Sequence, residues 1–99
     1  MRYEFDWDPA KAGSNLVKHG VSFEDAMSVF LDPLALSRLD DGGSTGEERW
    51  ITIGHNRDMK MLLVVHTFQE MPGVSAAIRI ISARRPTKHE TRQYEDGSS

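Results

Sequence analysis

The sequence contains no cysteine, which excludes a disulfide framework and a thiolate metal site. It also has no apolar run long enough to cross a membrane, and its first residues, Met-Arg-Tyr-Glu-Phe-Asp, lack the apolar region of a signal peptide. The four histidines are scattered, and no pair has metal-ligand spacing beside a carboxylate. We therefore expect a cytoplasmic protein that needs no metal or other cofactor and does not bind membranes.

Other common functional signatures are missing as well. There is no glycine-rich phosphate loop, no internal repeat, and no nucleophile elbow around Ser82. The 99 residues suffice for one hydrophobic core but not for two. The sequence therefore predicts a single domain over residues 1–99.

Charge is distributed unevenly along the chain, although the net charge is only −3. Residues 1–50 hold five Lys or Arg and ten Asp or Glu, whereas residues 51–99 hold seven and five. Residues 77–94 contain one acidic residue, Glu90, and five basic ones: Arg79, Arg84, Arg85, Lys88 and Arg92. Because a local basic patch is enough to bind a polyanion, this region allows a nucleic-acid partner.

The N-terminal part predicts a strand followed by two helices. Aromatic residues alternate with acidic ones over residues 3–8, as in a short strand with one aromatic face. Asp8 and Pro9 begin a first helix, which Gly20 ends. Its predicted apolar stripe is Ala12, Asn15, Leu16 and His19.

A second helix starts at Ser22, with Asp25 at the third helical position, and stops at Asp32-Pro33. Its predicted apolar face is Phe23, Ala26, Met27, Phe30 and Leu31.

The rest of the chain changes to the period of strands. We predict strands at 34–39, 47–55, 59–68 and 76–84, a flexible loop at 40–46, a hairpin loop at 69–75 and a helix at 87–95. Consecutive strands with short connections pair antiparallel. The expected fold is therefore α+β, with two N-terminal helices and a C-terminal helix packed on a four- to five-stranded antiparallel sheet.

The run Ile78–Arg85 has the β-branched composition of a buried strand, yet Arg79 interrupts it. Strict alternation would place Arg79, Ile81 and Ala83 on one face and Ile78, Ile80 and Ser82 on the other. A buried arginine is costly unless it meets a partner or a cleft. We therefore expect this strand to serve both the core and a functional site.

Short motifs in a fixed order run from about residue 5 to residue 95. They are Phe5-Asp-Trp-Asp, Lys11, Asn15-Leu16, Lys18-His-Gly-Val-Ser-Phe23, Ala26, Val29-Phe30, Asp32-Pro33, Gly46-Glu-Glu-Arg49, Ile53-Gly54, Leu62–Val65, Thr67 and Ile78-Arg-Ile-Ile-Ser-Ala-Arg84. Together these motifs resemble the BrnT family, ribonuclease toxins of bacterial type II toxin–antitoxin modules that are related to RelE-like toxins.

The resemblance implies a RelE-like fold and a metal-independent endoribonuclease that stops translation. It also implies a BrnA-like antitoxin partner with a ribbon-helix-helix region, within a hetero-oligomer that touches operator DNA only through the antitoxin. Two departures stand out: the run Phe68–Ser75 is longer than in the family and has no basic residue, and His55 stands where a basic residue is frequent.

RNA cleavage without a metal needs an acid, a base and cations around the reacting phosphate. Arg79 and Arg84 are the predicted catalytic cations, because a guanidinium can bond two phosphate oxygens at once. An internal ion pair is the alternative for Arg79, and bonding to helix carbonyls is the alternative for Arg84. His66 is the predicted acid or base, with a buried structural histidine as the alternative.

The remaining basic residues are candidate contacts for RNA. Lys88 and Arg92 share one face of the last predicted helix, and Tyr94 is a candidate to stack on a base. The full RNA-binding prediction is Lys60, Arg85, Lys88, Arg92 and Tyr94. The alternative function is an inactive interaction module that only binds an antitoxin or another regulator.

Overall fold

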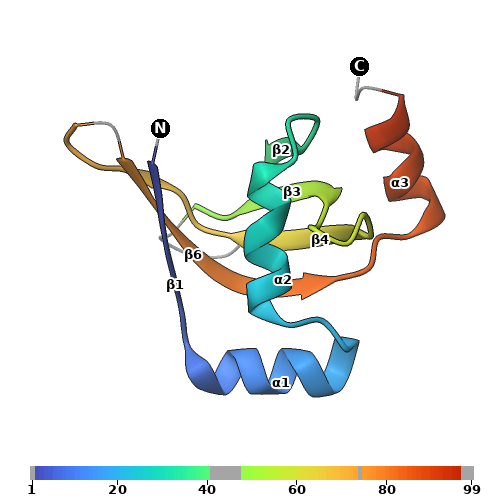
Figure 1. The fold of residues 1–99 in the computed structure, drawn as a ribbon, viewed down its shortest axis with the longest axis horizontal. Coiled ribbons are helices and arrows are strands. Elements are labelled where there is room, and N and C mark those ends of the chain that lie inside the picture. Colours follow the sequence, from blue (N-terminus) through green and yellow to red (C-terminus); the bar gives the residue numbers. More distant parts are fainter. Residues whose placement is uncertain (1, 41–47, 74, 97–99) are drawn as a thin grey trace.

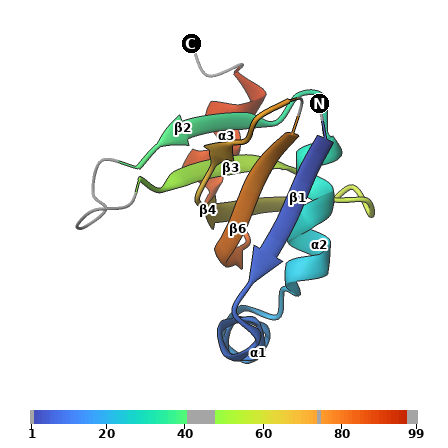
Figure 2. The ribbon, with the colours of Figure 1, turned by 90° about the vertical axis from the view of Figure 1, so that its left-hand side faces the viewer.

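A computed structural model describes residues 2–40, 48–73 and 75–96. Helices α1 (Pro9–His19) and α2 (Phe23–Ser28) lie against one face of a central sheet, and α3 (Lys88–Glu95) lies on the other side (Figures 1 and 2). The predicted α+β class and the three helices are therefore confirmed. None of these helices is long and apolar enough to span a membrane.

The sheet differs from the predicted one in its number of strands and in their direction. Its six strands are β1 (Arg2–Trp7), β2 (Leu36–Leu39), β3 (Trp50–His55), β4 (Met61–His66), β5 (Gln69–Glu70) and β6 (Ser75–Arg84). The order is β1-β6-β4-β3-β2, with β5 also paired to β6. The prediction of a four- to five-stranded antiparallel sheet was wrong, because β1 runs parallel to β6.

The physical reason is that β1 and β6 come from opposite ends of the chain. The rule that short loops join antiparallel strands applies only to neighbours in sequence, and it does not fix how β1 pairs. The extra strand, β5, lies in the predicted 69–75 loop, where Gln69 and Glu70 pair with Ala77 and Ala76. Most of the predicted 40–46 loop lies outside the described residues.

The N-terminal helices begin and end where the sequence predicts. The Asp8 carboxylate accepts a hydrogen bond from the Ala10 N–H at 2.9 Å, and Gly20 adopts the left-handed conformation with φ 70°. Ser22 Oγ accepts from the Asp25 N–H at 3.1 Å. A 3₁₀ turn, η1 (Val29–Leu31), then continues α2 as far as Asp32.

The core lies between these helices and the sheet. It consists of Val21, Phe23, Ala26, Val29, Leu62, Val64, Ile78, Ile80 and Ala83. Two predicted apolar positions were wrong, because Leu16 is 52% exposed and Leu31 is 80% exposed. Val29 is buried in place of Leu31 because the 3₁₀ turn has three residues per turn, which rotates the buried face.

Asn15 is the polar member of the buried layer and joins α1 to β6. Its side-chain amide donates to the carbonyls of Val21 and Ala83 at 2.9 and 2.8 Å, and its oxygen accepts from the Ala83 N–H at 3.1 Å. The Asn15 side chain therefore satisfies the backbone of β6 at the point where α1 packs on it.

A β-bulge in β6 changes which residues share a face. Val65 pairs with Ser82 but His66 pairs with Ile80, so Ile81 is the extra residue. Ala83 consequently joins Ile78 and Ile80 in the core, contrary to strict alternation. The bulge also brings Arg84 to the same face as Arg79, the face that points away from α1 and α2.

Candidate functional site

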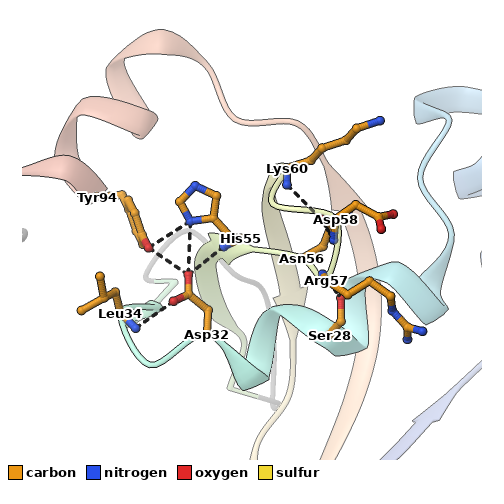
Figure 3. A network of polar contacts seen from close by, with 9 residues as sticks. All are labelled: Ser28, Asp32, Leu34, His55, Asn56, Arg57, Asp58, Lys60 and Tyr94. Atoms are coloured by element: carbon orange, nitrogen blue, oxygen red, sulfur yellow. Dashed lines mark hydrogen bonds and ion pairs between the residues drawn. The ribbon is translucent and has the colours of Figure 1, made fainter.

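The most connected polar cluster lies between α3 and the end of β3 (Figure 3). Tyr94 of α3 donates its O–H to Asp32 Oδ2 at 2.8 Å, and the backbone N–H of His55 donates to the same oxygen at 2.8 Å. The imidazole Nδ1 of His55 lies 3.2 Å from the Tyr94 oxygen and 3.5 Å from Asp32 Oδ2. Three distant parts of the chain therefore converge on one carboxylate.

The surroundings keep Asp32 ionised. Burial alone would raise the pKa of its carboxyl group, but hydrogen bonds from the N–H groups of His55 and Leu34 and from Tyr94 lower it below the ordinary value. Burial beside this carboxylate, and the hydrogen bond to it, raise the pKa of Tyr94 to about 12. Tyr94 therefore stays protonated and acts as a fixed donor to Asp32.

These bond directions assign the proton on His55. The single phenolic hydrogen of Tyr94 goes to Asp32, and a carboxylate only accepts, so Nδ1 of His55 carries a proton and donates it. The other ring nitrogen, Nε2, lies on the opposite edge of the ring (Figure 3). No described residue bonds to it, and the side chain is 31% exposed. Nε2 is thus an accessible lone pair that can accept a proton.

Gly54 allows Asp32 to come this close to β3. A Cβ atom at Gly54 would lie 3.0 Å from Asp32 Oδ2 and 3.0 Å from Ala35 Cβ. The absence of a side chain at this position therefore leaves room for the carboxylate next to His55.

The turn that follows His55 is held rigidly and carries two exposed cations, Arg57 and Lys60 (Figure 3). The Asn56 side-chain oxygen accepts from the N–H groups of Asp58 and Lys60, at 2.9 and 3.0 Å. Ser28 Oγ accepts from the Arg57 N–H at 2.9 Å, which fastens the turn to α2. The backbone that presents these cations is therefore fixed by buried polar side chains.

Several of the predicted RNA contacts gather at this end of the sheet. Leu63 pairs with Arg84, so the start of β4 lies beside the segment that joins β6 to α3 (Figure 1). Five basic residues flank this junction, which we call the cationic end: Arg57, Lys60, Arg84, Arg85 and Lys88. His55 lies on the same sheet face as Arg84, with β4 between their strands.

Arg84 is already paired within the chain. Its guanidinium forms a two-point contact with Glu90, both distances being 3.0 Å, and it also donates to the Arg85 carbonyl at 3.1 Å. The hydrogen bonds from Arg84 lower the pKa of Glu90 to about 2. Three of about five guanidinium donors are used, so two remain for another ligand.

His66, the predicted acid or base, lies on the opposite face and is 2% exposed. Its Nδ1 is 2.9 Å from the Thr67 carbonyl, which only accepts, so Nδ1 carries the proton. Its Nε2 accepts from Thr52 Oγ1 at 2.7 Å, and burial lowers the pKa of the ring. With both nitrogens bonded, this geometry favours the structural alternative.

Arg79 lies far along β6 from the cationic end. Its guanidinium pairs with Asp6, its register partner on β1, and both side chains are exposed. Arg84 lies five positions after Arg79, which is about 13–16 Å along a strand with one bulge. The two arginines therefore do not hold one phosphate together while each keeps its present partner.

The other predicted contacts differ in exposure. Arg85, Lys88 and Arg92 are exposed, whereas the ring of Tyr94 packs edge-on against His55 at a centroid distance of 5.4 Å. Beneath α3 a hollow of about 220 Å³ separates Tyr94 and Glu90 from apolar side chains of β3 and β4.

The sequence alone did not reveal Asp32 as a site residue, and it left the role of His55 undecided. Nothing in the sequence near either residue links it to Tyr94.

Within residues 2–40, 48–73 and 75–96, no group of three or more His, Asp or Glu side chains is arranged to hold a metal ion. The arrangement around His55 instead supplies an oriented imidazole, a buried carboxylate and nearby cations. These groups suit proton transfer at a phosphodiester.

Comparison with known proteins identifies the family. Residues 7–90 match the family model described as ribonuclease toxin, BrnT, of type II toxin–antitoxin system. The chain belongs to the BrnT family. A search of curated proteins finds no match.

A BrnT fold is also found among solved structures. The crystal structure of the Brucella abortus ribonuclease toxin BrnT superposes with a TM-score of 0.58 at 22% identity, covering 89% of this chain and 100% of that one. At this identity the similarity supports the fold. The match to the BrnT family model goes further than the fold, because this family consists of ribonuclease toxins that are paired with an antitoxin.

Proposed function

We propose that this protein is the endoribonuclease toxin of a type II toxin–antitoxin module, and that it cleaves RNA in the cytoplasm without a metal ion and so stops translation. A BrnA-like antitoxin with a ribbon-helix-helix region neutralises it in a hetero-oligomer, and operator DNA is contacted only through that antitoxin. The observation that carries the proposal is the free Nε2 of His55, oriented by Asp32 and Tyr94 next to the cationic end.

In the proposed reaction, His55 Nε2 removes the proton from the ribose 2′-hydroxyl. The 2′-oxygen attacks the adjacent phosphorus, the bond from phosphorus to the 5′-oxygen breaks, and water protonates the leaving oxygen. The products are a 2′,3′-cyclic phosphate and a 5′-hydroxyl. The free donors of Arg84, together with Lys60 and Arg85, offset the negative charge that develops on the phosphate.

The other basic residues have supporting roles in this proposal. Lys88 and Arg92, both exposed on α3, and Arg79, in the middle of β6, bind phosphates on either side of the cleaved bond. His66 has a structural role in the sheet in this proposal, because both of its ring nitrogens are already hydrogen-bonded, to Thr52 and Thr67.

The test is incubation of purified protein with a structured RNA in the presence of a chelator. We expect cleavage, and we expect His55→Ala to reduce its rate at least about 100-fold while leaving the fold intact. The matched control is His89→Ala, since His89 is an exposed histidine on α3. Equal rates for the two variants would remove His55 from the reaction.

One observation favours the second candidate, an inactive interaction module. The Arg84 guanidinium is largely neutralised by Glu90, which lowers the positive charge available to RNA. A chain that binds an antitoxin tightly and leaves every RNA intact would establish this second function.

A further inference from the structure

A second hollow, of about 660 Å³, lies on the sheet face that α1 and α2 cover, at the end away from the cationic end. It opens where β3 begins and β4 gives way to β5. We call it the aromatic groove, since its walls include Tyr3, Phe30, Trp50 and Phe68. Its size falls within the range of about 300–1,000 Å³ that is usual for binding pockets.

The groove is acidic. Glu48 and Glu70 lie in its lining, and the lining residues in the described part of the chain include no lysine or arginine. His66 forms part of the floor, where burial lowers the pKa of its ring, so the neutral ring donates from Nδ1 to a carbonyl and accepts from Thr52 at Nε2. The two carboxylates therefore set the charge of the groove.

Part of the apolar surface around the groove is exposed and is not covered by the protein's own core. Tyr3 is 38% exposed, Phe68 is 37% exposed and the neighbouring Met71 is 40% exposed. Tyrosine and tryptophan in a concave setting are the residues that contribute most to protein–protein binding. β5 pairs only with β6 among the described strands, and its two residues, Gln69 and Glu70, line the groove.

We infer that the aromatic groove binds a segment of the antitoxin that presents a large apolar side chain beside a lysine or arginine. The aromatic walls would hold the apolar side chain, and Glu48 and Glu70 would pair with the cation. RNA is disfavoured, because its phosphates would face two carboxylates without a compensating cation. This inference rests on the proposed function, since it requires the antitoxin partner.

The test uses the full chain and the antitoxin encoded beside its gene. The sequence has two tryptophans, Trp7 and Trp50, so a Trp7→Phe background leaves Trp50 as the only one. Phenylalanine keeps an aromatic ring at position 7, where Trp7 packs on Phe23. We expect antitoxin binding to shift the Trp50 emission. The double variant Glu48→Lys with Glu70→Lys should weaken the affinity about 10- to 100-fold, and Phe68→Ser should weaken it about 10-fold.

The matched controls are the double variant Glu4→Lys with Glu24→Lys, and Met59→Ser. These exposed positions lie outside the groove. The affinity of the control variants for the antitoxin should therefore stay within about twofold of that of the parent. Thermal unfolding of every variant establishes that it is folded.

Three results would overturn the inference, and they separate it from the proposed function. If the antitoxin binds the parent and the groove variants equally, the groove is not its site, although the module still stands. If a 20-nucleotide RNA shifts Trp50 and binds the double lysine variant more tightly, the occupant is RNA. If the antitoxin does not bind the parent chain, the proposed partner and the inference both fail.

Discussion

Replacing Asp32 with asparagine tests the proton arrangement at the site most sharply, because the two side chains have nearly the same shape. Asp32 accepts from the N–H groups of Leu34 and His55, at 2.9 and 2.8 Å, and from Tyr94 at 2.8 Å. The amide can place its nitrogen at the Oδ2 position, where it faces the His55 N–H, or at the Oδ1 position, where it faces the Leu34 N–H, and two donors do not bond. One backbone N–H is unpaired in either orientation, which costs about 1–3 kcal/mol when it is the more buried N–H of His55.

With the amide nitrogen at the Oδ2 position, the same change reverses the proton relay. The amide nitrogen of Asp32→Asn donates to the Tyr94 oxygen, so the phenol turns its hydrogen toward Nδ1 of His55. The proton of the imidazole then moves to Nε2, and the site loses its free lone pair. We expect RNA cleavage to fall about 100- to 10,000-fold, the scale of losing a correctly oriented base.

The assay is ¹⁵N nuclear magnetic resonance of the histidine ring, which reports which nitrogen carries the proton without reference to activity. The parent protein should show His55 protonated on Nδ1, and Asp32→Asn should show it protonated on Nε2. Asp58→Asn, an exposed change in the adjacent turn, is the control and should leave the His55 signal unchanged. A parent protein with the proton on Nε2 would refute the assigned directions.

Three further changes test the fold and its charges. Arg79→Ala should cost less than about 1 kcal/mol in urea unfolding, because the Arg79–Asp6 pair is exposed; a loss above about 3 kcal/mol would mean that the pair behaves as a buried one. Glu90→Gln should lower the melting temperature at pH 7. Since the folded pKa of Glu90 is about 2 and its ordinary value is 4.5, this difference should be complete above pH 4.5 and should disappear as the pH falls toward 2; a constant difference across that range would contradict the pairing. Gly54→Ala should destabilise the protein by about 1–3 kcal/mol and shift the His55 ring signals, because a Cβ there meets Asp32; Gly13→Ala, where no atom lies within 4 Å, is the control.

Local signals were sufficient to predict the helices. Asp8, Ser22 and Gly20 act through bonds to backbone only a few residues away, so the sequence near each helix end contains the information. The pairing of β1 with β6 has no local signal, because the two strands are separated by most of the chain. The bulge at Ile81 is also set by pairing with β4, and one extra residue is enough to change the face of Arg84.

The site was predicted less completely than the fold for the same reason. Asp32 and His55 are 23 residues apart, and His55 and Tyr94 are 39 apart. The sequence shows Asp32-Pro33 as the end of a helix and His55 as the last residue of a strand, and both descriptions are locally correct. Only the crossing of α3 over the end of β3 brings the three side chains together.

We propose that this chain cleaves RNA through attack by the ribose 2′-hydroxyl, with His55 as the base. The most direct measurement compares an RNA oligonucleotide with the same oligonucleotide carrying one 2′-deoxy substitution at the mapped cleavage site, in the presence of a chelator. We expect cleavage of the RNA to a 2′,3′-cyclic phosphate and a 5′-hydroxyl, and no cleavage at the substituted position. Cleavage of the substituted oligonucleotide, or products ending in a 5′-phosphate, would contradict it.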